Sequence, residues 1–297
     1  MVTCEVPADG STLTATTSGN LGEHVMVCES QVRQRMKPPI ETSMLDVRRL
    51  TKRYSALTAI QDLSFEVHQG EVLGLLGPNG SGKSTTVKIL SGLLRPTNGS
   101  VRLDGADILA DLPAYKAVLG YVPEEPHLYS YLTAPEYLRL VGGLRRLPQA
   151  TLEGRIDQFL RLLDIYDDRY QTLSSYSKGM KQKVLIAAAM LHDPRIVVLD
   201  EPFSGLDVSA ARVLKAFVRG LAAEGKIIVF SSHVLEVVEQ VCSRVVILKD
   251  GRSVGHDSVD HLRATLELPS LDAVFAALVA EDNVDDRSRK LLAAMKA

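Results

Sequence analysis

The sequence has little of several features that would assign a protein to a class. Its 297 residues include only three cysteines, Cys4, Cys28 and Cys242, which lie far apart and form no C-x-x-C pair. This pattern predicts free thiols and favours neither a zinc site nor a disulfide framework. The longest unbroken apolar run, VLIAAAML at 184–191, is far shorter than the ~20 residues that a membrane-spanning helix needs. We therefore do not expect this chain to cross a bilayer.

The chain also lacks an excess of charge of either sign. Its 34 lysine and arginine residues nearly balance 36 aspartate and glutamate residues, for a formal net charge of -2. Because the bulk positive charge typical of many nucleic-acid binders is missing, we expect no nucleic-acid partner. The first residues, MVTCEVPADGSTLT, have neither the basic nor the apolar segment of a secretory signal. We expect a cytoplasmic protein.

Enough apolar material is present, at 45% of the residues, to build a sizeable core. Residues 1–43 have no sustained period and are predicted to be a flexible leader without an assigned role. From Met44 onward, apolar strand-like runs alternate with helical patterns, which indicates an α/β fold with a mostly parallel sheet. Asp104-Gly105 predicts a hairpin turn, and Thr133 to Glu136 (TAPE) predicts a capping box that opens a helical block reaching Leu191. Residues 257–297 are predicted to be a helical tail that packs on the body or on a partner.

A glycine-rich loop carries the strongest chemical signal. The segment GPNGSGKS at 77–84 fits G-x-x-x-x-G-K-[ST], follows the strand-like VLGLL and opens the helix-like TTVKIL. Backbone N–H groups of such a loop point inward and bind phosphate oxygens, and the positive end of the next helix adds attraction. Lys83 is expected to reach the β- and γ-phosphates, and the Ser84 hydroxyl to bind Mg²⁺. The residues assigned to the nucleotide here are Gly77, Pro78, Asn79, Gly80, Ser81, Gly82, Lys83, Ser84 and Thr85.

A second motif supplies carboxylates. In RIVVLDE, at 195–201, an apolar strand ends in Asp200, which fits the Walker B pattern in which that aspartate belongs to the magnesium shell. Glu201 follows it directly and is the candidate to orient and deprotonate an attacking water. Together with the loop at Lys83, this pair predicts a nucleotide-hydrolysing site.

From about Met44 to Gly251 the sequence resembles the ATP-binding cassette (ABC) family, because further motifs occur in the family's order. The segment SKGMKQ at 177–182 is similar to the signature motif, and SGLD at 204–207 is similar to the D-loop. His233 matches the switch histidine. Tyr54 lies where the family places an aromatic that stacks on adenine. GYVPE, at 120–124, occupies the Q-loop position.

The resemblance implies an α/β fold: a P-loop NTPase core with a mostly parallel sheet, an antiparallel β subdomain and an inserted α-helical subdomain. The ABC ATPase domain would span 44–256, with the helical subdomain at about 125–190. ATP would lie between two protomers, with Ser177 and Gly179 of one copy on the γ-phosphate held by the other. His233 would hydrogen-bond to the γ-phosphate, and Asp207 would contact the second copy. Simpler roles remain open: a structural histidine, Tyr54 packed in the core, and Asp207 as a helix N-cap.

Two places depart from the family pattern. Glu124 stands where the family has glutamine; it can still bind Mg²⁺ through its oxygens, but it adds negative charge near the phosphates. In the signature segment, Lys178 replaces a glycine and Met180 replaces the glutamine. Lys178 either attracts the facing phosphate or points to solvent.

The segments YSKGMKQK and GYVPEEPHLYSYLT are similar to those of the ATP-binding subunits of ABC-2-type exporters. This resemblance implies an ATPase that dimerises, drives a separate membrane permease and lies peripherally on the inner face of the membrane. Residues from about Glu125 to Leu140 would then receive the permease. The apolar string Leu128, Tyr129, Tyr131 and Leu132 would line that groove or pack in the core. One alternative is an ABC ATPase acting on ribosomes or DNA, although such proteins usually carry two cassettes. Another is a small-molecule phosphotransferase, which would not need the signature segment.

Overall fold

The computed structural model describes residues 43–279. The predicted leader, Cys4, Cys28 and the last part of the predicted tail lie outside the described residues. Cys242 lies inside them and is a free, buried thiol, as expected. Across residues 43–279, no helix combines the length and the apolar character that crossing a bilayer demands.

One sheet is antiparallel and has the strand order β2-β1-β4-β5. Alternate residues of β1, among them Leu45 and Val47, point into the core, as expected for a sheet with one buried face. The predicted hairpin turn is confirmed between β4 and β5, where Asp104 and Gly105 both have positive φ, 51° and 81°. The strands are β1 (Met44–Tyr54), β2 (Leu57–His68), β4 (Asn98–Leu103) and β5 (Ala106–Asp107).

The second sheet has the order β10-β9-β3-β8-β7-β6, and all its pairs are parallel except β10 with β9. Strands β3, β7 and β8 are buried along their whole length, which explains why they read as continuous apolar runs. The mostly parallel sheet expected from the sequence is thus confirmed. The strands are β3 (Val72–Leu76), β6 (Leu119–Val122), β7 (Ile196–Asp200), β8 (Ile227–Ser231), β9 (Arg244–Lys249) and β10 (Arg252–Ser258).

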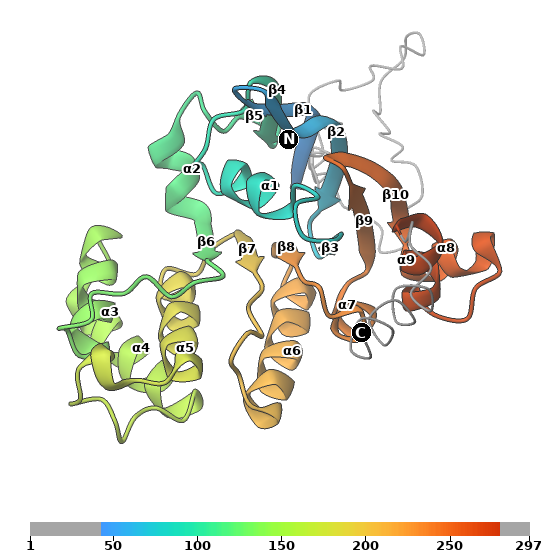
Figure 1. The fold of residues 1–297 in the computed structure, drawn as a ribbon. Helices are drawn as coiled ribbons and strands as arrows, with labels where there is room; N and C mark the ends of the chain where they lie inside the picture. Colours follow the sequence, from blue (N-terminus) through green and yellow to red (C-terminus); the bar gives the residue numbers. More distant parts are fainter. Residues whose placement is uncertain (1–42, 280–297) are drawn as a thin grey trace, which may run out of the picture. The chain divides into compact units, whose positions relative to one another are not determined.

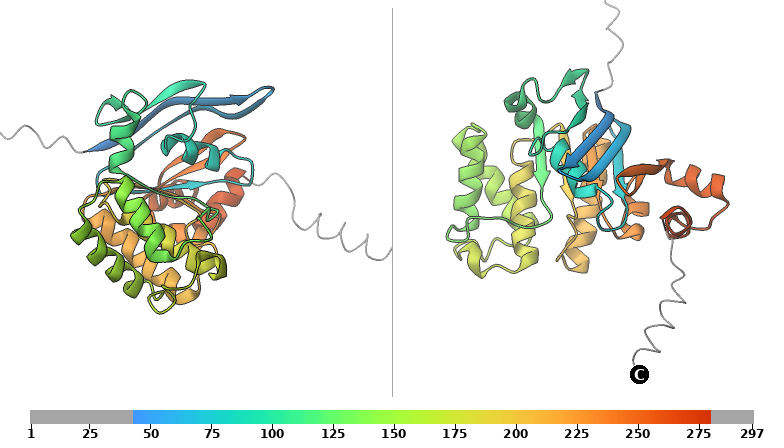
Figure 2. Two further views of the ribbon diagram at one scale, coloured as in Figure 1. Left: turned by 90° about the vertical axis from the view of Figure 1, so that its left-hand side faces the viewer. Right: turned by 45° about the horizontal axis from the view of Figure 1, so that its top comes forward.

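The parallel sheet separates two layers of core. In Figure 1 the antiparallel sheet and α1 lie above the parallel sheet, and α6 and α7 lie below it. One face packs on the antiparallel sheet, α1 and α2; the other packs on α5, α6, α7 and α9. The left view of Figure 2 shows α1 between the two sheets. Four of these helices belong neither to the helical subdomain nor to the tail. They are α1 (Lys83–Leu90), α2 (Leu112–Val118), α6 (Val208–Ala223) and α7 (Leu235–Val241).

An α-helical subdomain follows β6 and has a core cluster of its own. It contains α3 (Ala134–Leu144), α4 (Gln149–Leu162), the 3₁₀ turn η1 (Leu173–Ser175) and α5 (Lys178–Met190). The predicted capping box is present: Thr133 N donates to Glu136 Oε2 at 2.8 Å, and the Thr133 hydroxyl accepts from Glu136 N. The helical period expected from Thr133 to Leu191 is confirmed in α3, α4 and α5 and is interrupted between α4 and α5. There Asp164 takes a φ of 52° and Ile165 turns into the core.

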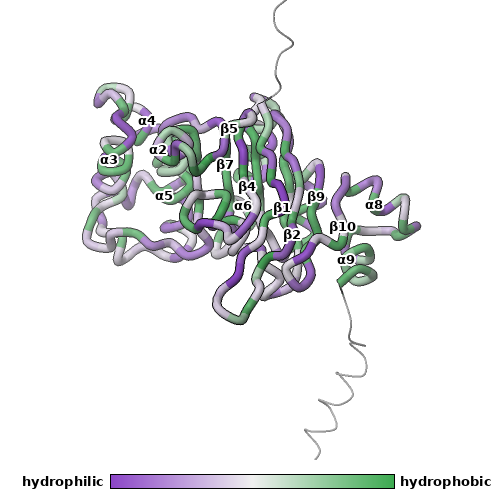
Figure 3. Tube along the Cα trace, turned by 90° about the horizontal axis from the view of Figure 1, so that it is seen from above, coloured by the Kyte–Doolittle hydropathy of each residue, from purple (hydrophilic) through white to green (hydrophobic). Residues whose placement is uncertain are grey.

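The tail forms α8 (Val259–Leu266) and α9 (Leu271–Val279). Helix α9 is strongly apolar, as its green colour in Figure 3 shows, and it packs against α7. The backbone N–H of Leu271 donates to Glu239 Oε1 at 2.6 Å, which fixes the start of α9 to α7. Of the two expected packing partners for the tail, the described part packs on the body of the same chain.

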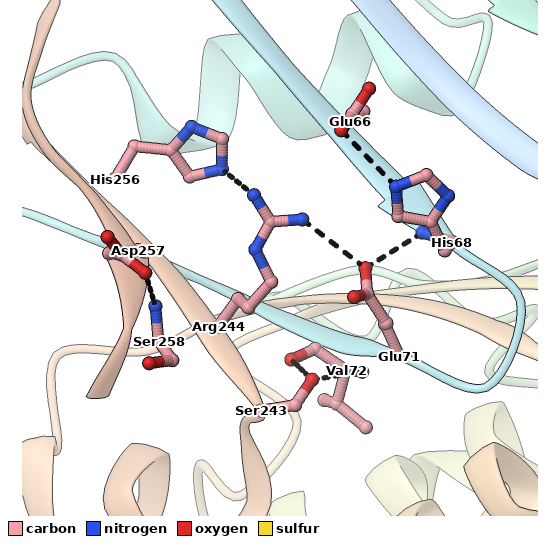
Figure 4. Close-up of polar contacts among 9 residues, drawn as sticks. All are labelled: Glu66, His68, Glu71, Val72, Ser243, Arg244, His256, Asp257 and Ser258. Atoms are coloured by element: carbon pink, nitrogen blue, oxygen red, sulfur yellow. Dashed lines mark hydrogen bonds and ion pairs between the residues drawn. The ribbon is translucent and has the colours of Figure 1, made fainter. Parts of the chain in front are cut away.

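A polar cluster joins β10 to the turn between β2 and β3 (Figure 4). Arg244 donates to His256 Nε2 at 3.0 Å and lies 3.6 Å from Glu71 Oε2. Since a guanidinium only donates, the accepting His256 ring is neutral, and burial together with Arg244 lowers its pKa. This cluster holds the β9–β10 hairpin in place, and Gly251 of its turn donates its N–H to the Ser81 carbonyl at 3.2 Å.

Candidate functional site

A cavity of about 400 Å³ lies at the carboxyl ends of β3, β7 and β8. Ligands of open α/β sheets commonly bind at this edge, because the loops that follow the strands converge there. All of the expected catalytic and metal-binding residues meet in it, although the phosphate loop and β7 are more than a hundred residues apart. The cavity is lined by Gly77, Pro78, Asn79, Lys83, Ser84, Glu124, Asp200, Glu201, Ser232, His233, Leu235 and Phe275.

The phosphate loop passes close to neighbouring backbone, and two glycines make this possible. Gly77 has a φ of 153°, and an added Cβ atom would lie 2.4 Å from the carbonyl oxygen of Leu248. Gly82 has a φ of 104°, and its added Cβ would lie 2.7 Å from the carbonyl oxygen of Ala59. A larger residue at either position would displace the loop. Ser81 Oγ is buried in this loop without a hydrogen-bond partner among the described residues.

Lys83 begins α1 and is almost fully buried. Its Nζ donates to the carbonyl oxygens of Gly77 and Pro78 at 2.6 and 3.1 Å. Burial lowers the pKa of Lys83, while the negative charges of Glu201, Asp200 and Glu124 oppose that effect. The amine therefore interacts electrostatically with all three carboxylates that line the cavity.

Asp200 and Ser231 occupy paired positions at the ends of β7 and β8. Ser231 Oγ donates to Asp200 Oδ1 at 2.5 Å, and both residues are buried. Burial raises the pKa of Asp200, which the Ser231 bond opposes. The negative charge of Glu124 raises the Asp200 pKa further, and Lys88 and Lys83 lower it. Ser231 was not among the residues expected at the site.

Glu201 leaves the strand with a φ of 46°, a strained value for a residue that is not glycine. Its backbone N–H donates to the carbonyl and hydroxyl oxygens of Ser231, both at 3.2 Å. Its Oε1 lies 2.9 Å from Nδ1 of His233, whose ring is largely exposed. The carboxylate and the imidazole, which are 32 positions apart in the sequence, therefore form one unit at the cavity mouth.

The other expected residues lie outside the cavity wall. Tyr54, at the end of β1, is 43% exposed, so the alternative of a core aromatic is wrong; Lys52 Nζ lies 5.1 Å from its ring centre. Ser177 caps α5, accepting from Met180 N at 3.1 Å, and Asp207 caps α6, accepting from Ala210 N at 2.9 Å. The N-cap interpretation of Asp207 is confirmed. Gly80, Ser81, Gly82 and Thr85 belong to the phosphate loop or to α1 but do not line the cavity, and Gly179 packs elsewhere.

Sequence reasoning missed four residues of the site. Ser231 and Ser232 stand directly before His233, so the end of the strand IIVFS carried a signal that could have found them. Leu235 follows the histidine within the next helix. Phe275 comes from α9, and no local pattern linked the tail to the phosphate loop.

The residues present fit a nucleotide with a divalent cation. Within residues 43–279, no group of three or more histidine, cysteine, aspartate or glutamate side chains could hold a metal alone. The cavity instead offers the Ser84 hydroxyl and the Asp200 carboxylate. A site with only a few protein oxygens suits Mg²⁺, because this ion takes its other ligands from phosphates and water.

Comparisons with known proteins agree with this geometry. Residues 60–204 match the family model described as ABC transporter. An ABC transporter ATP-binding protein of Methanocaldococcus jannaschii is 38% identical over 227 residues, which cover 76% of this chain and 80% of that protein. A Nod factor export ATP-binding protein of Cupriavidus pinatubonensis is 32% identical over 230 residues, covering 76% and 71%. A solved structure of an ATP-binding subunit of an ABC transporter superposes with a TM-score of 0.75 at 36% identity, covering 79% of this chain and 99% of that one. The chain therefore belongs to the ABC transporter family, as one of its ATP-binding, ATP-hydrolysing subunits.

Proposed function

We propose that this chain binds ATP with Mg²⁺ in the cavity, closes with a second ABC ATPase subunit around two nucleotides, and couples hydrolysis to a separate membrane permease. The observation that carries the proposal is the meeting of Lys83, Asp200, Glu201 and His233 at the carboxyl edge of one sheet. A phosphate loop, a buried metal-binding carboxylate and a carboxylate–imidazole pair are what phosphoryl transfer to water needs.

Each residue has a defined task in this mechanism. The loop amides and Lys83 bind the phosphates and stabilise the charge that develops on the γ-phosphoryl group. Ser84, Asp200 and Glu124 would hold Mg²⁺, which neutralises phosphate charge. Glu201 orients a water and accepts its proton. His233 keeps the Glu201 carboxylate in place and can turn its exposed ring to the γ-phosphate.

A second copy completes the site. Ser177 and Asp207 are exposed at helix starts and do not line this chain's own cavity. Ser177 begins the 13-residue helix α5, whose free amides and positive end favour a phosphate. In a closed dimer these groups, with Gly179, would contact the nucleotide held by the partner, and Tyr54 would stack on adenine in its own subunit. A homodimer is the simplest assembly that supplies them.

The permease would contact the segment before α3. Tyr129 and Tyr131 are 54% and 72% exposed, with ring centres 6.0 Å apart, and Tyr129 also contacts Tyr137 of α3. Exposed aromatic pairs of this kind favour a protein partner over solvent. Binding a permease would place the chain on the inner face of the membrane. The relative named for Nod factor export supports export as the direction of transport.

Two variants test the catalytic assignment. Glu201→Gln should retain ATP binding, lose most turnover and accumulate a closed dimer on size-exclusion chromatography with ATP. Lys83→Ala should bind ATP more weakly by calorimetry, whereas Lys215→Ala, on the surface of α6, should bind it normally. Hydrolysis by Glu201→Gln at the parent rate would overturn the assignment of the base.

Fractionation of cells tests the transport assignment. The chain should copurify with an integral membrane protein from detergent-solubilised membranes. Sedimentation with ribosomes instead would favour the alternative of an ABC ATPase that acts on ribosomes or DNA.

A further inference from the structure

The first turn of α5 is bound to the D-loop segment (Ser204–Asp207) of the same chain. Lys178 Nζ donates to Ser204 Oγ at 2.7 Å. One turn further on, Gln182 is fully buried and its Nε2 donates to the carbonyl oxygen of Pro202 at 3.3 Å. Residues four apart lie on the same face of a helix, so one face of α5 contacts both ends of the segment 202–204.

Backbone packing brings the two segments into direct contact. Gly179 faces Gly205 so closely that an added Cβ atom would lie 2.4 Å from the Gly205 carbonyl oxygen. Gly205 has a φ of 79°, and its own Cβ would lie 3.0 Å from Cγ of Lys178. The aliphatic stem of Lys178 therefore covers Gly205 while its amine reaches Ser204. The D-loop segment therefore contacts Lys178 on one side, while Leu206 packs against the core.

We propose that Lys178 is a positioning residue that fixes the D-loop segment to the start of α5, so that Ser177 and Asp207 meet a second copy as one preassembled unit. This inference rests on the proposed function, because both ends of the unit act on the partner's nucleotide. The sequence left open whether Lys178 attracts the facing phosphate or points to solvent; the residue is exposed, and the proposal adds a positioning role. The amine has a partner within its own chain, 26 positions away.

The hydrogen bond sets the size of the expected effect. If the transition state loses the net free energy that a single hydrogen bond typically contributes, the rate of hydrolysis falls about three- to tenfold. Lys178→Met keeps the stem over Gly205 and removes the donor, and Ser204→Ala removes the acceptor. Each should lower kcat of ATP hydrolysis by about this factor, and the double variant should lose no more than either single variant.

The matched control is Lys215→Met. Lys215 Nζ also donates to a side chain on a neighbouring element, Gln240 Oε1 at 2.9 Å, but it lies in the middle of α6, about two turns beyond the D-loop segment. It should keep the parent kcat. If Lys178→Met lowers kcat while Ser204→Ala does not, Lys178 acts on the facing nucleotide directly and the positioning role is overturned.

Hydrogen exchange of the nucleotide-free chain provides a readout that needs no hydrolysis. The amides of Ser204 and Leu206 donate to Glu201 and Phe203 carbonyls, so their exchange reports opening of the D-loop segment. Exchange of a peptide covering 203–207 should be about three- to tenfold faster in Lys178→Met and in Ser204→Ala than in the parent. Unchanged exchange would overturn the proposed contact, and faster exchange with the parent kcat would overturn its role in the reaction. A parent chain without ATPase activity would instead contradict the proposed function, while the exchange result would still decide the contact.

Discussion

The Glu201 carboxylate lies 2.9 Å from Nδ1 of His233, across the carboxyl ends of two neighbouring strands. The register of β7 with β8 allows this contact, because it places Asp200 beside Ser231. Glu201 and His233, which follow these strands, therefore lie at the same edge of the sheet. The expected acceptor of the histidine was a γ-phosphate. In this structure the ring contacts the carboxylate of the candidate base, and the contact with a γ-phosphate stays a prediction.

Removal of the imidazole should slow hydrolysis without weakening nucleotide binding. We expect His233→Ala to lower kcat by about a hundredfold or more, the usual range for a lost acid–base group, while the Kd for ATP stays near that of the parent. The kcat of His233→Gln, whose amide can still donate to Glu201, should lie between those of the parent and of His233→Ala. A parent-like kcat in His233→Ala would show that the pair is structural.

Glu124 should make ATP binding depend more strongly on magnesium. A nucleotide without a metal meets the negative charges of Asp200, Glu201 and Glu124 together. Glu124→Gln should therefore raise ATP affinity in EDTA by about three- to tenfold, which corresponds to about 1 kcal/mol of relieved repulsion. The gain should shrink or reverse with excess Mg²⁺, because Glu124 would bind the metal.

The neighbouring residue offers a control for this measurement. Glu125 is exposed, pairs with His127 at 3.6 Å and does not line the cavity. Glu125→Gln should change the ATP affinity neither in EDTA nor with excess Mg²⁺. An equal gain for Glu124→Gln with and without Mg²⁺ would contradict its assignment as a metal ligand.

Ser231 should matter for both stability and the state of Asp200. Its hydroxyl is fully buried, donates to Asp200 and accepts from the Glu201 N–H. Ser231→Ala should lower the free energy of unfolding by about 1–3 kcal/mol in urea titrations, since a buried carboxylate loses its donor. It should also raise the pKa of Asp200 and move the acid limb of the hydrolysis profile to higher pH. Ser253→Ala, at an exposed serine of β10, should do neither.

His192 should make the protein less stable in mild acid. Its Nε2 donates to the Leu119 carbonyl at 3.0 Å, its Nδ1 is buried without a partner, and burial with Arg145 nearby lowers its pKa from 6.5 to about 4. Between these pH values the unfolded chain binds more protons at this residue than the folded chain. The contribution of His192 to the free energy of unfolding is therefore complete above pH 6.5. It decreases as the pH falls, by at most about 1.4 kcal/mol per pH unit.

The contribution of His192 can be separated from other titrating groups by substitution. His192→Asn keeps a donor for Leu119 but does not titrate, so its unfolding free energy should fall less than the parent's between pH 7.5 and pH 5. His127→Asn, on the exposed side of the chain, should follow the parent curve. Equal losses in the parent and in His192→Asn would contradict a neutral, buried imidazole.

Local sequence was sufficient for the elements that carry the chemistry. The phosphate loop, the strand that ends at Asp200, the capping box at Thr133 and the cap of α6 at Asp207 follow from short-range patterns. Such patterns reflect backbone hydrogen bonds and burial within a few residues, which the sequence encodes directly. The expected helical block failed between Leu162 and Lys178, because tertiary packing of Ile165 and Leu173 replaces helical bonds there.

The sequence by itself thus determined where the phosphate-loop and carboxylate motifs lie, since those motifs are contiguous and their geometry is local. Only the tertiary structure decided that β8 lies between β3 and β7, which brings Ser231 onto Asp200 and His233 onto Glu201. It also decided that Phe275 reaches the cavity and that Lys178 binds Ser204. The physical reason is that strand order and helix docking follow from burying apolar faces distant in the sequence, and no short pattern specifies which faces meet.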